Sequence, residues 1–254
     1  LIRLHRSPQA MSHPASRPRV ADVVTPDGIA AVDHAITSRR SIRRFLPTPV
    51  ERATIEEMLA VASRAPSGTN TQPWNVHVLT GTSRQSLVDK VLAAAGDTDA
   101  SQRYTEKYDY YPREWISPFI DRRRKVGWDL YGLLGLDKAN RLGMQMQQAR
   151  NFLFFDAPVG LIFTVHPIMG RGSLLDYGMF LQSFMVAARA RGLDTCPQAA
   201  WNSFHTVILD HLGLDAAQHT MVCGMALGHA DPAAIENTLL TEREPVSNFT
   251  TFLD

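Results

Sequence analysis

The chain has 254 residues, of which 44% are hydrophobic and 20% are charged, so it can bury the core of one domain. Its formal net charge of +1, from 26 basic and 25 acidic residues, excludes a protein whose whole surface binds nucleic acid. No apolar run approaches the roughly eighteen residues of a membrane span, and Cys196 and Cys223 lack metal-binding spacing. We therefore expect a cytoplasmic protein with reduced thiols, no metal and no membrane or nucleic-acid partner.

The first 28 residues read as a flexible arm, because Pro8, Pro14, Pro18 and Pro26 are interspersed with Ser, Arg and His. This stretch has no apolar centre of the kind that signal peptides carry. Met11 is a plausible start, which leaves open whether residues 1–10 belong to the native chain. A single domain is expected over residues 29–254.

Two short helices and a turn-rich loop follow the arm. Ala31, Val32, Ala35 and Ile36 have helical spacing and predict a helix that ends at Ser38-Arg39. A second amphipathic helix is expected over Thr54–Arg64, which Ala65-Pro66 ends. The loop Pro66–Trp74 then leads directly into a strand, Asn75–Leu79.

Four arginines and a serine stand together between these helices, at Arg39, Arg40, Ser41, Arg43 and Arg44. Charge-assisted donors at this density favour an anionic partner such as a phosphate. Arg39, Ser41 and Arg43 alternate, so their side chains share one side if the segment is extended. Taken alone, an Arg-Arg-Ser motif is also common on solvated surfaces.

The two stretches together resemble a known family. Arg-Arg-Ser-Ile-Arg-x-Phe at 39–45, followed by Ala-Pro-Ser-Gly-x-Asn-x-Gln-Pro-Trp at 65–74, is similar to the N-terminal signature of FMN-dependent nitroreductases. The resemblance covers residues 31–81 and resumes from about residue 150 to residue 252. It implies an α+β fold with a central, mostly antiparallel sheet flanked by helices, in an intertwined homodimer that exchanges C-terminal arms.

The resemblance also implies a cofactor and a reaction. FMN would bind at the dimer interface, take hydride at N5 from NADH or NADPH, and pass electrons to a small nitroaromatic or quinone-like acceptor in a ping-pong cycle. No catalytic side chain is expected, and Arg43 and Gln198 would tune the ring. The cofactor-binding candidates are Arg39, Arg40, Ser41, Arg43, Pro66, Ser67, Gly68, Asn70, Gln72, Pro197, Gln198, Ala199, Gly228 and Arg243.

Each group of candidates has an expected place. Arg39, Arg40, Ser41 and Arg243 would hold the phosphate and ribityl end, and Arg43 the N1 and C2 carbonyl edge of the ring. The loop that begins at Pro66 would come from the other subunit. Some members of the family carry a lysine where this chain has Thr241, so phosphate binding would depend more on the arginines.

Residues 96–148 are expected to form a helical excursion over the active site. They are rich in aromatic residues, of which Tyr111, Trp115 and Tyr131 are the candidate contacts for substrate. A helix is expected over Arg113–Leu134, and its basic run Arg122–Lys125 reads most simply as a solvated face.

The second half of the chain gives four further elements. Helices are expected over Lys138–Phe155 and over Ser173–Arg191, the latter with Ser173 as N-cap, and strands over Val159–Val165 and Thr220–Leu227. His205, His211 and His219 are expected at the surface, because the nine histidines show no chelating pattern.

Three other interpretations remain open at this point. A relative could use the flavin for reductive dehalogenation or for fragmentation of the flavin with oxygen. A binding protein could hold FMN without turnover. The sequence names neither the physiological acceptor nor the preferred nicotinamide.

Overall fold

The computed structural model describes residues 25–253, so the arm expected over residues 1–28 lies, for residues 1–24, outside the described residues. Helix α1 (Pro26–Ser38) opens the described chain, and the hydroxyl of Thr25 caps it by accepting the N–H of Gly28 at 3.0 Å. Proline in the first turn costs nothing, since the N–H it lacks would be unpaired there. The helix therefore begins three residues before the domain boundary expected at residue 29.

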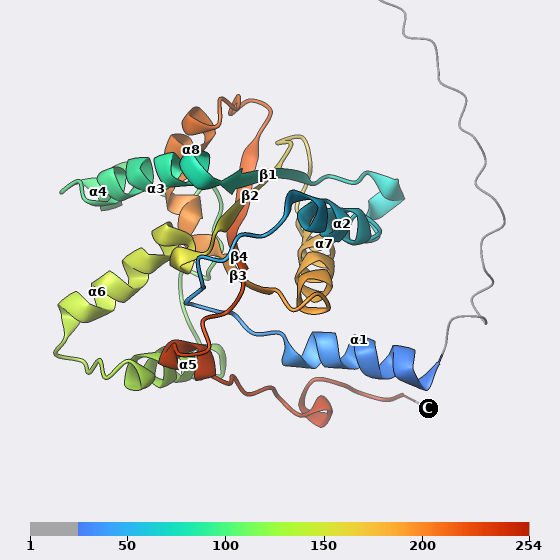
Figure 1. The fold of residues 1–254 in the computed structure, drawn as a ribbon. Helices are drawn as coiled ribbons and strands as arrows, with labels where there is room; N and C mark the ends of the chain where they lie inside the picture. Colours follow the sequence, from blue (N-terminus) through green and yellow to red (C-terminus); the bar gives the residue numbers. More distant parts are fainter. Residues whose placement is uncertain (1–24, 254) are drawn as a thin grey trace, which may run out of the picture.

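A four-stranded sheet forms the centre of the molecule, in the order β1-β2-β4-β3 (Figure 1). Its strands are β1 (Asn75–Thr80), β2 (Val159–Val165), β3 (Asp194–Gln198) and β4 (Thr220–Gly228). All three pairings are antiparallel. This confirms the expected α+β architecture. β2 and β4 are the central strands, which explains why β2 is buried at every position and reads as an unbroken apolar run.

Helices cover both faces of the sheet and divide the core in two. On one face α2 (Arg52–Ala62) packs with the long helix α7 (Gly172–Arg189), and Leu161 and Phe163 of β2 point toward them. On the other face lie α3 (Gly81–Ala95), α8 (His205–His211) and the 3-10 segment η4 (Ala199–Phe204), with Ile162 of β2. Successive side chains of β2 thus serve opposite cores.

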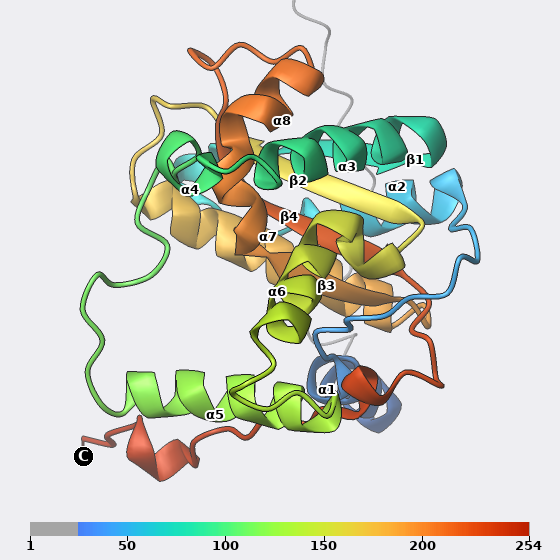
Figure 2. The ribbon, with the colours of Figure 1, turned by 90° about the vertical axis from the view of Figure 1, so that its left-hand side faces the viewer.

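The excursion after α3 holds three helices, α4 (Ala100–Arg103), α5 (Phe119–Leu133) and α6 (Arg141–Ala149). Figure 2 shows α5 away from the sheet, beside the C-terminal segment. The expected start of this helix at Arg113 is wrong, because the residues before Pro118 form an irregular aromatic cluster instead of a helical turn.

The expected helix Lys138–Phe155 is shorter and ends in a strained turn. Asn140 caps α6 by accepting the N–H of Gly143 at 2.9 Å. After Ala149 the chain tightens into η3 (Arg150–Asp156), in which Phe154, Phe155 and Asp156 have positive φ angles of 51°, 53° and 68°. Consecutive left-handed residues of this size are costly and must be held by surrounding contacts.

Three further expectations are corrected. Ser173 does not cap α7, which begins at Gly172; its N–H instead bonds the carbonyl of Gly170 at 3.0 Å. Helices α3 and α8 were not predicted. His205, His211 and His219, expected at the surface, are all half-buried, and Nδ1 of His219 lies 3.1 Å from the hydroxyl of Thr164. Among residues 25–253, no helix is both long enough and apolar enough to span a membrane.

Candidate functional site

The arginine-rich segment leaves α1 as an extended strand beside β3. Ser41 forms a parallel bridge with Thr195, and the N–H of Ile42 donates to the carbonyl of Thr195 at 3.1 Å. The side chains of Ile42 and Phe45 are buried and anchor the segment in the core. The polar side chains between them are thereby held in fixed positions.

A cavity of about 430 Å³ lies between this segment and residues 239–243. Four guanidinium groups and three hydroxyl groups line it, and within the described chain no carboxylate does. Its lining residues are Ile36, Thr37, Arg39, Arg40, Ser41, Arg43, Leu239, Leu240, Thr241 and Arg243. Arg39, Ser41 and Arg43 line this cavity together, as the alternation predicts, but Arg40 lines it as well, which the alternation does not predict. The fold adds Arg243 from the other end of the sequence.

We call this the four-arginine cavity, and its charges favour the binding of an anion. Burial and the nearby charge of Arg243 lower the pKa of Arg39, since both disfavour its charged form. The Nε atom of Arg39 is buried without a hydrogen-bond partner in the part of the chain that the structure describes. Among residues 25–253, Arg243 donates only to its own neighbours, Thr241 Oγ1 at 2.8 Å and the carbonyl of Glu242 at 2.8 Å among them. A phosphate would satisfy these donors and relieve the repulsion.

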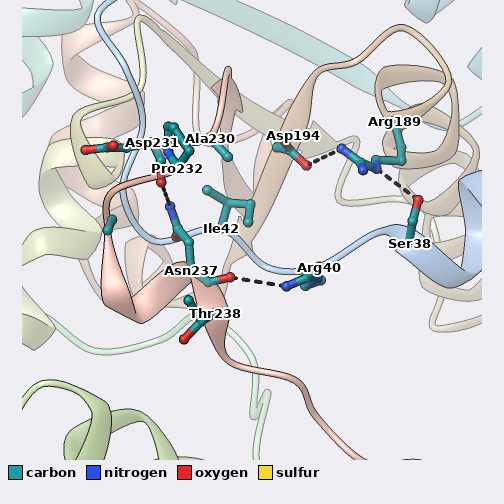
Figure 3. Close-up of a pocket in the computed structure, with 11 residues that line it drawn as sticks. Ser38, Arg40, Ile42, Arg189, Asp194, Ala230, Asp231, Pro232, Asn237 and Thr238 are labelled. Atoms are coloured by element: carbon teal, nitrogen blue, oxygen red, sulfur yellow. Dashed lines mark hydrogen bonds and ion pairs between the residues drawn. The ribbon is translucent and has the colours of Figure 1, made fainter.

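Asn237 fixes the backbone behind the arginines. Its side-chain oxygen accepts the N–H of Arg43 at 2.8 Å, and its amide nitrogen donates to the carbonyls of Arg44 at 2.8 Å and Asp231 at 3.0 Å. Its own carbonyl accepts from Arg40 at 3.4 Å. Figure 3 shows Asn237 between Arg40 and the turn at Asp231, in a second, smaller cavity of about 290 Å³. Asn237 belongs to the 3-10 helix η5 (Ile235–Thr238). Sequence reasoning missed it, because a single asparagine carries no pattern.

A charged network supports the same segment from another side. Asp156 accepts from Arg44 at 2.9 Å and from Arg150 at 3.1 Å, and Arg150 also donates to the carbonyl of Arg43 at 3.1 Å. Arg44 reaches the buried carboxylate of Glu236 at 3.4 Å as well. The strained turn that ends in Asp156 therefore carries the carboxylate that orients Arg44 and Arg150. None of these roles is visible in the sequence.

The loop after α2 lies outside the four-arginine cavity. It contains the 3-10 turn η2 (Gly68–Asn70), in which Gly68 donates its N–H to Asp176 at 3.2 Å and Ser67 accepts the N–H of Gln72 at 3.0 Å. Asn70 and Gln72 have φ angles of 61° and 48°. The structure does not bring these candidates, or Pro66, to the arginines of the same chain.

The candidates of β3 and β4 are built into the sheet. Gln198 is 2% exposed, donates its amide to the carbonyl of Asn151 at 2.8 Å and accepts from Trp201 at 3.3 Å, so its side chain is occupied internally. Pro197 is exposed and Ala199 half-buried beside it. Gly228 lies so close to Pro158 that a Cβ atom would stand 2.8 Å from that ring. Neither Gln198 nor Gly228 lines the four-arginine cavity.

Cys196 lies close to the arginines but is not a nucleophile. Burial raises the pKa of its thiol to about 11, against the opposing pull of Arg43, and burial raises that of Cys223 to about 12. Both thiols are free and stay protonated near neutral pH.

The three substrate candidates do not form one group. Tyr111 and Trp115 lie together before α5, with ring centroids 5.6 Å apart. Tyr131 lies near the other end of that helix, 6.1 Å from Trp128, and its hydroxyl accepts from Gln148 at 3.4 Å.

Comparison with known proteins gives consistent matches over most of the chain. A family profile described as "Nitroreductase family" matches residues 36–229. The 4-nitrobenzoate reductase of Pseudomonas putida is 43% identical over 87% of this chain and 95% of its own length. The nitrobenzene nitroreductase of Ectopseudomonas oleovorans is 36% identical over 87% and 96%.

A solved structure shows the same fold. The FMN and NADPH-dependent nitroreductase NfnB from Sphigopyxis sp. strain HMH superposes with a TM-score of 0.84 at 34% identity. The match covers 88% of this chain and 99% of that one.

Proposed function

Because the chain belongs to the nitroreductase family, we propose that it is an FMN-dependent oxidoreductase that takes electrons from NADH or NADPH and reduces nitroaromatic compounds. The relatives at 43% and 36% identity are named for nitroaromatic substrates, and the structural neighbour is named for FMN and NADPH. All of them align over almost their whole length.

The four-arginine cavity is the observation that carries this proposal. It offers guanidinium and hydroxyl donors, holds an unsatisfied buried Nε on Arg39, and is lined within the described chain by no acid that could neutralise it. This donor set fits the phosphate of FMN. When bound, FMN supplies the hydride chemistry that side chains cannot perform.

The residues of this chain divide the work of binding and orientation. Arg39, Arg40, Ser41 and Arg243 hold the phosphate and ribityl end, which they can reach together because they line one cavity. Arg43 places a positive charge at the ring edge, where negative charge develops during reduction. Asn237 and Arg150 bond its backbone N–H and carbonyl and so keep Arg43 in place.

The other cofactor candidates act through the backbone or from a second copy. The side chain of Gln198 is occupied, so Pro197, Gln198 and Ala199 contact the ring through main-chain groups. Gly228 shapes the sheet end by allowing the close approach of Pro158. The loop of Pro66, Ser67, Gly68, Asn70 and Gln72 reaches the cofactor of the partner subunit.

A homodimer with exchanged C-terminal arms is part of the proposal. The segment after Thr238 carries apolar side chains that its own chain leaves open, among them Phe249 at 69% and Phe252 at 81% exposure. Helix α1 likewise presents Ile29, Val32 and Ile36 to solvent. Burial of such surfaces against a second copy would favour association. We place the enzyme in the cytoplasm, which agrees with two free thiols.

The test is a spectrum of the purified protein before and after anaerobic addition of NADPH or NADH. We expect the absorbance of bound FMN, its loss on reduction, and its recovery when a nitroarene is added. A protein that binds FMN but is not reduced would be a binding protein. One that stays colourless after incubation with FMN would overturn the cofactor assignment.

A further inference from the structure

The basic run of α5 is not a uniform solvated face. Arg122 pairs with Glu244 at 2.9 Å, and Lys125 pairs with Asp129 at 2.8 Å. Arg123 is different: its guanidinium lies over the ring of Trp115 at 4.6 Å and over that of Tyr111 at 5.6 Å. Within residues 25–253 it forms no ion pair with a carboxylate. Arg123 is thus held by aromatic rings and keeps its charge available.

Of the two rings under Arg123, that of Tyr111 is open to solvent and that of Trp115 is half-buried. Tyr111 is 52% exposed, and its neighbour Tyr110, in edge contact at 4.7 Å, is 50% exposed. Exposed aromatic faces next to a cation are costly to leave in water and favourable for binding a flat ring. We call Tyr111, Trp115 and Arg123 the aromatic platform.

The helix that carries Arg123 contacts the C-terminal segment that carries Arg243. The pair of Arg122 and Glu244 joins α5 to the segment that carries Arg243, as the neighbouring course of the two in Figure 2 shows. A cavity of about 300 Å³ between α5 and this segment shares Thr241 and Arg243 with the four-arginine cavity. Arg123 follows Arg122 directly on the helix.

We propose that the aromatic platform binds nitroaromatic acceptors that carry a carboxylate, and that Arg123 determines this specificity. The inference rests on the proposed function and names its substrate class. A planar guanidinium can meet a carboxylate with two parallel N–H groups, while Tyr111 and Trp115 contact the aromatic ring. A nitroarene without a carboxylate would keep the contacts with the two rings and lack only the contact with the guanidinium.

The experiment compares two acceptors of nearly equal shape with the holoenzyme, 4-nitrobenzoate and nitrobenzene. In the Arg123→Gln variant we expect kcat/KM for 4-nitrobenzoate to fall about tenfold or more through KM, and that for nitrobenzene to change by less than about twofold. The kcat/KM of Arg123→Lys for 4-nitrobenzoate should lie between those of the unsubstituted protein and Arg123→Gln, because lysine keeps the charge but not the planar guanidinium. Equal effects on both acceptors, or none, would overturn the proposal.

Arg124→Gln is the matched control. Arg124 is exposed on the same helix and loses the same charge, but it lies over neither ring of the platform. This variant should change kcat/KM for neither acceptor by more than about twofold. If Arg124→Gln also lowers kcat/KM selectively for 4-nitrobenzoate, the loss comes from the overall positive charge of the basic run. The proposed contact of Arg123 would then be wrong.

Calorimetry with compounds that cannot be reduced separates this inference from the proposed function. The full protein should bind benzoate at least about tenfold more tightly than benzamide, and Arg123→Gln should abolish the difference. Equal binding of the two by the unsubstituted protein would refute the platform. Failure to reduce either nitroarene would instead refute the proposed function, whatever the result with benzoate.

Discussion

The side-chain oxygen of Asn237 accepts the backbone N–H of Arg43 at 2.8 Å, across 194 positions of sequence. The amide of the same side chain donates to two carbonyl groups, those of Arg44 and Asp231. The side chain of Asn237 therefore bonds the backbone of Arg43 and Arg44, as a neighbouring strand would. The geometry of the four-arginine cavity depends on this residue.

Replacing Asn237 by aspartate should weaken cofactor binding. The isosteric carboxylate cannot donate, so it faces the carbonyls of Arg44 and Asp231 without bonding them and repels them. We expect a loss of about 1–3 kcal/mol in the free energy of unfolding and about tenfold or more in FMN affinity, measured by fluorescence titration.

Asn140→Asp provides the control for that change. Asn140 caps α6, a position where aspartate serves as well as asparagine. It should leave both quantities unaltered. An Asn237→Asp variant with normal FMN affinity would show that the arginines hold their positions without it.

Replacing Arg39 by glutamine should weaken FMN binding and stabilise the protein without cofactor. The variant loses a charge-assisted donor to phosphate, so the dissociation constant for FMN should rise roughly 10–100-fold while that for riboflavin stays nearly constant. The protein without cofactor should become more resistant to urea, because burial and Arg243 both disfavour the charge of Arg39. Arg52→Gln, which removes an exposed arginine of α2, should change neither the dissociation constant for FMN nor the resistance to urea. Equal losses for FMN and riboflavin would place Arg39 away from the phosphate.

Asp156→Asn should destabilise the fold without straining the backbone further. Asparagine tolerates the positive φ of this position as well as aspartate does, so the change isolates the charge. Arg44 and the largely buried Arg150 would lose their shared carboxylate. We expect a loss of about 1–2 kcal/mol in the free energy of unfolding, measured with urea. Asp129→Asn, which breaks an exposed pair within α5, should cost less than about 0.5 kcal/mol.

The contact of His77 and His219 through Thr164 should make stability depend on pH. Burial, and secondarily His219, lower the pKa of His77 from its ordinary 6.5. The unfolded chain therefore takes up this proton first as the pH falls. The contribution of neutral His77 is complete above about pH 6.5 and is lost as the pH falls toward the lower pKa of the folded state.

Urea unfolding at about pH 7.5 and about pH 5.5 measures this contribution. The unsubstituted protein should lose more stability over this range than His77→Gln, by up to about 1.4 kcal/mol per pH unit within the titration window. His34→Gln, at an exposed position of α1, is the control and should follow the unsubstituted protein. Identical slopes for the protein and His77→Gln would contradict the assignment.

The sequence by itself determined the elements with a clear period. Strand β2 was placed at its observed bounds, and α2 and β1 within two residues, because apolar spacing and the Ala65-Pro66 break are local signals. The alternation of Arg39, Ser41 and Arg43 also predicted their common side. Helix α3 carries Leu87, Val88 and Val91 at helical spacing on its buried face, but it was not predicted.

Tertiary structure alone decided which distant groups meet. Asn237, Arg150 and Asp156 support the arginines through hydrogen bonds whose partners lie far along the chain, and no local pattern records such contacts. The left-handed turn at Phe154–Asp156 replaced the expected helix because packing and the ion pairs of Asp156 outweigh helical propensity there. Local spacing encodes elements, whereas the site depends on their packing.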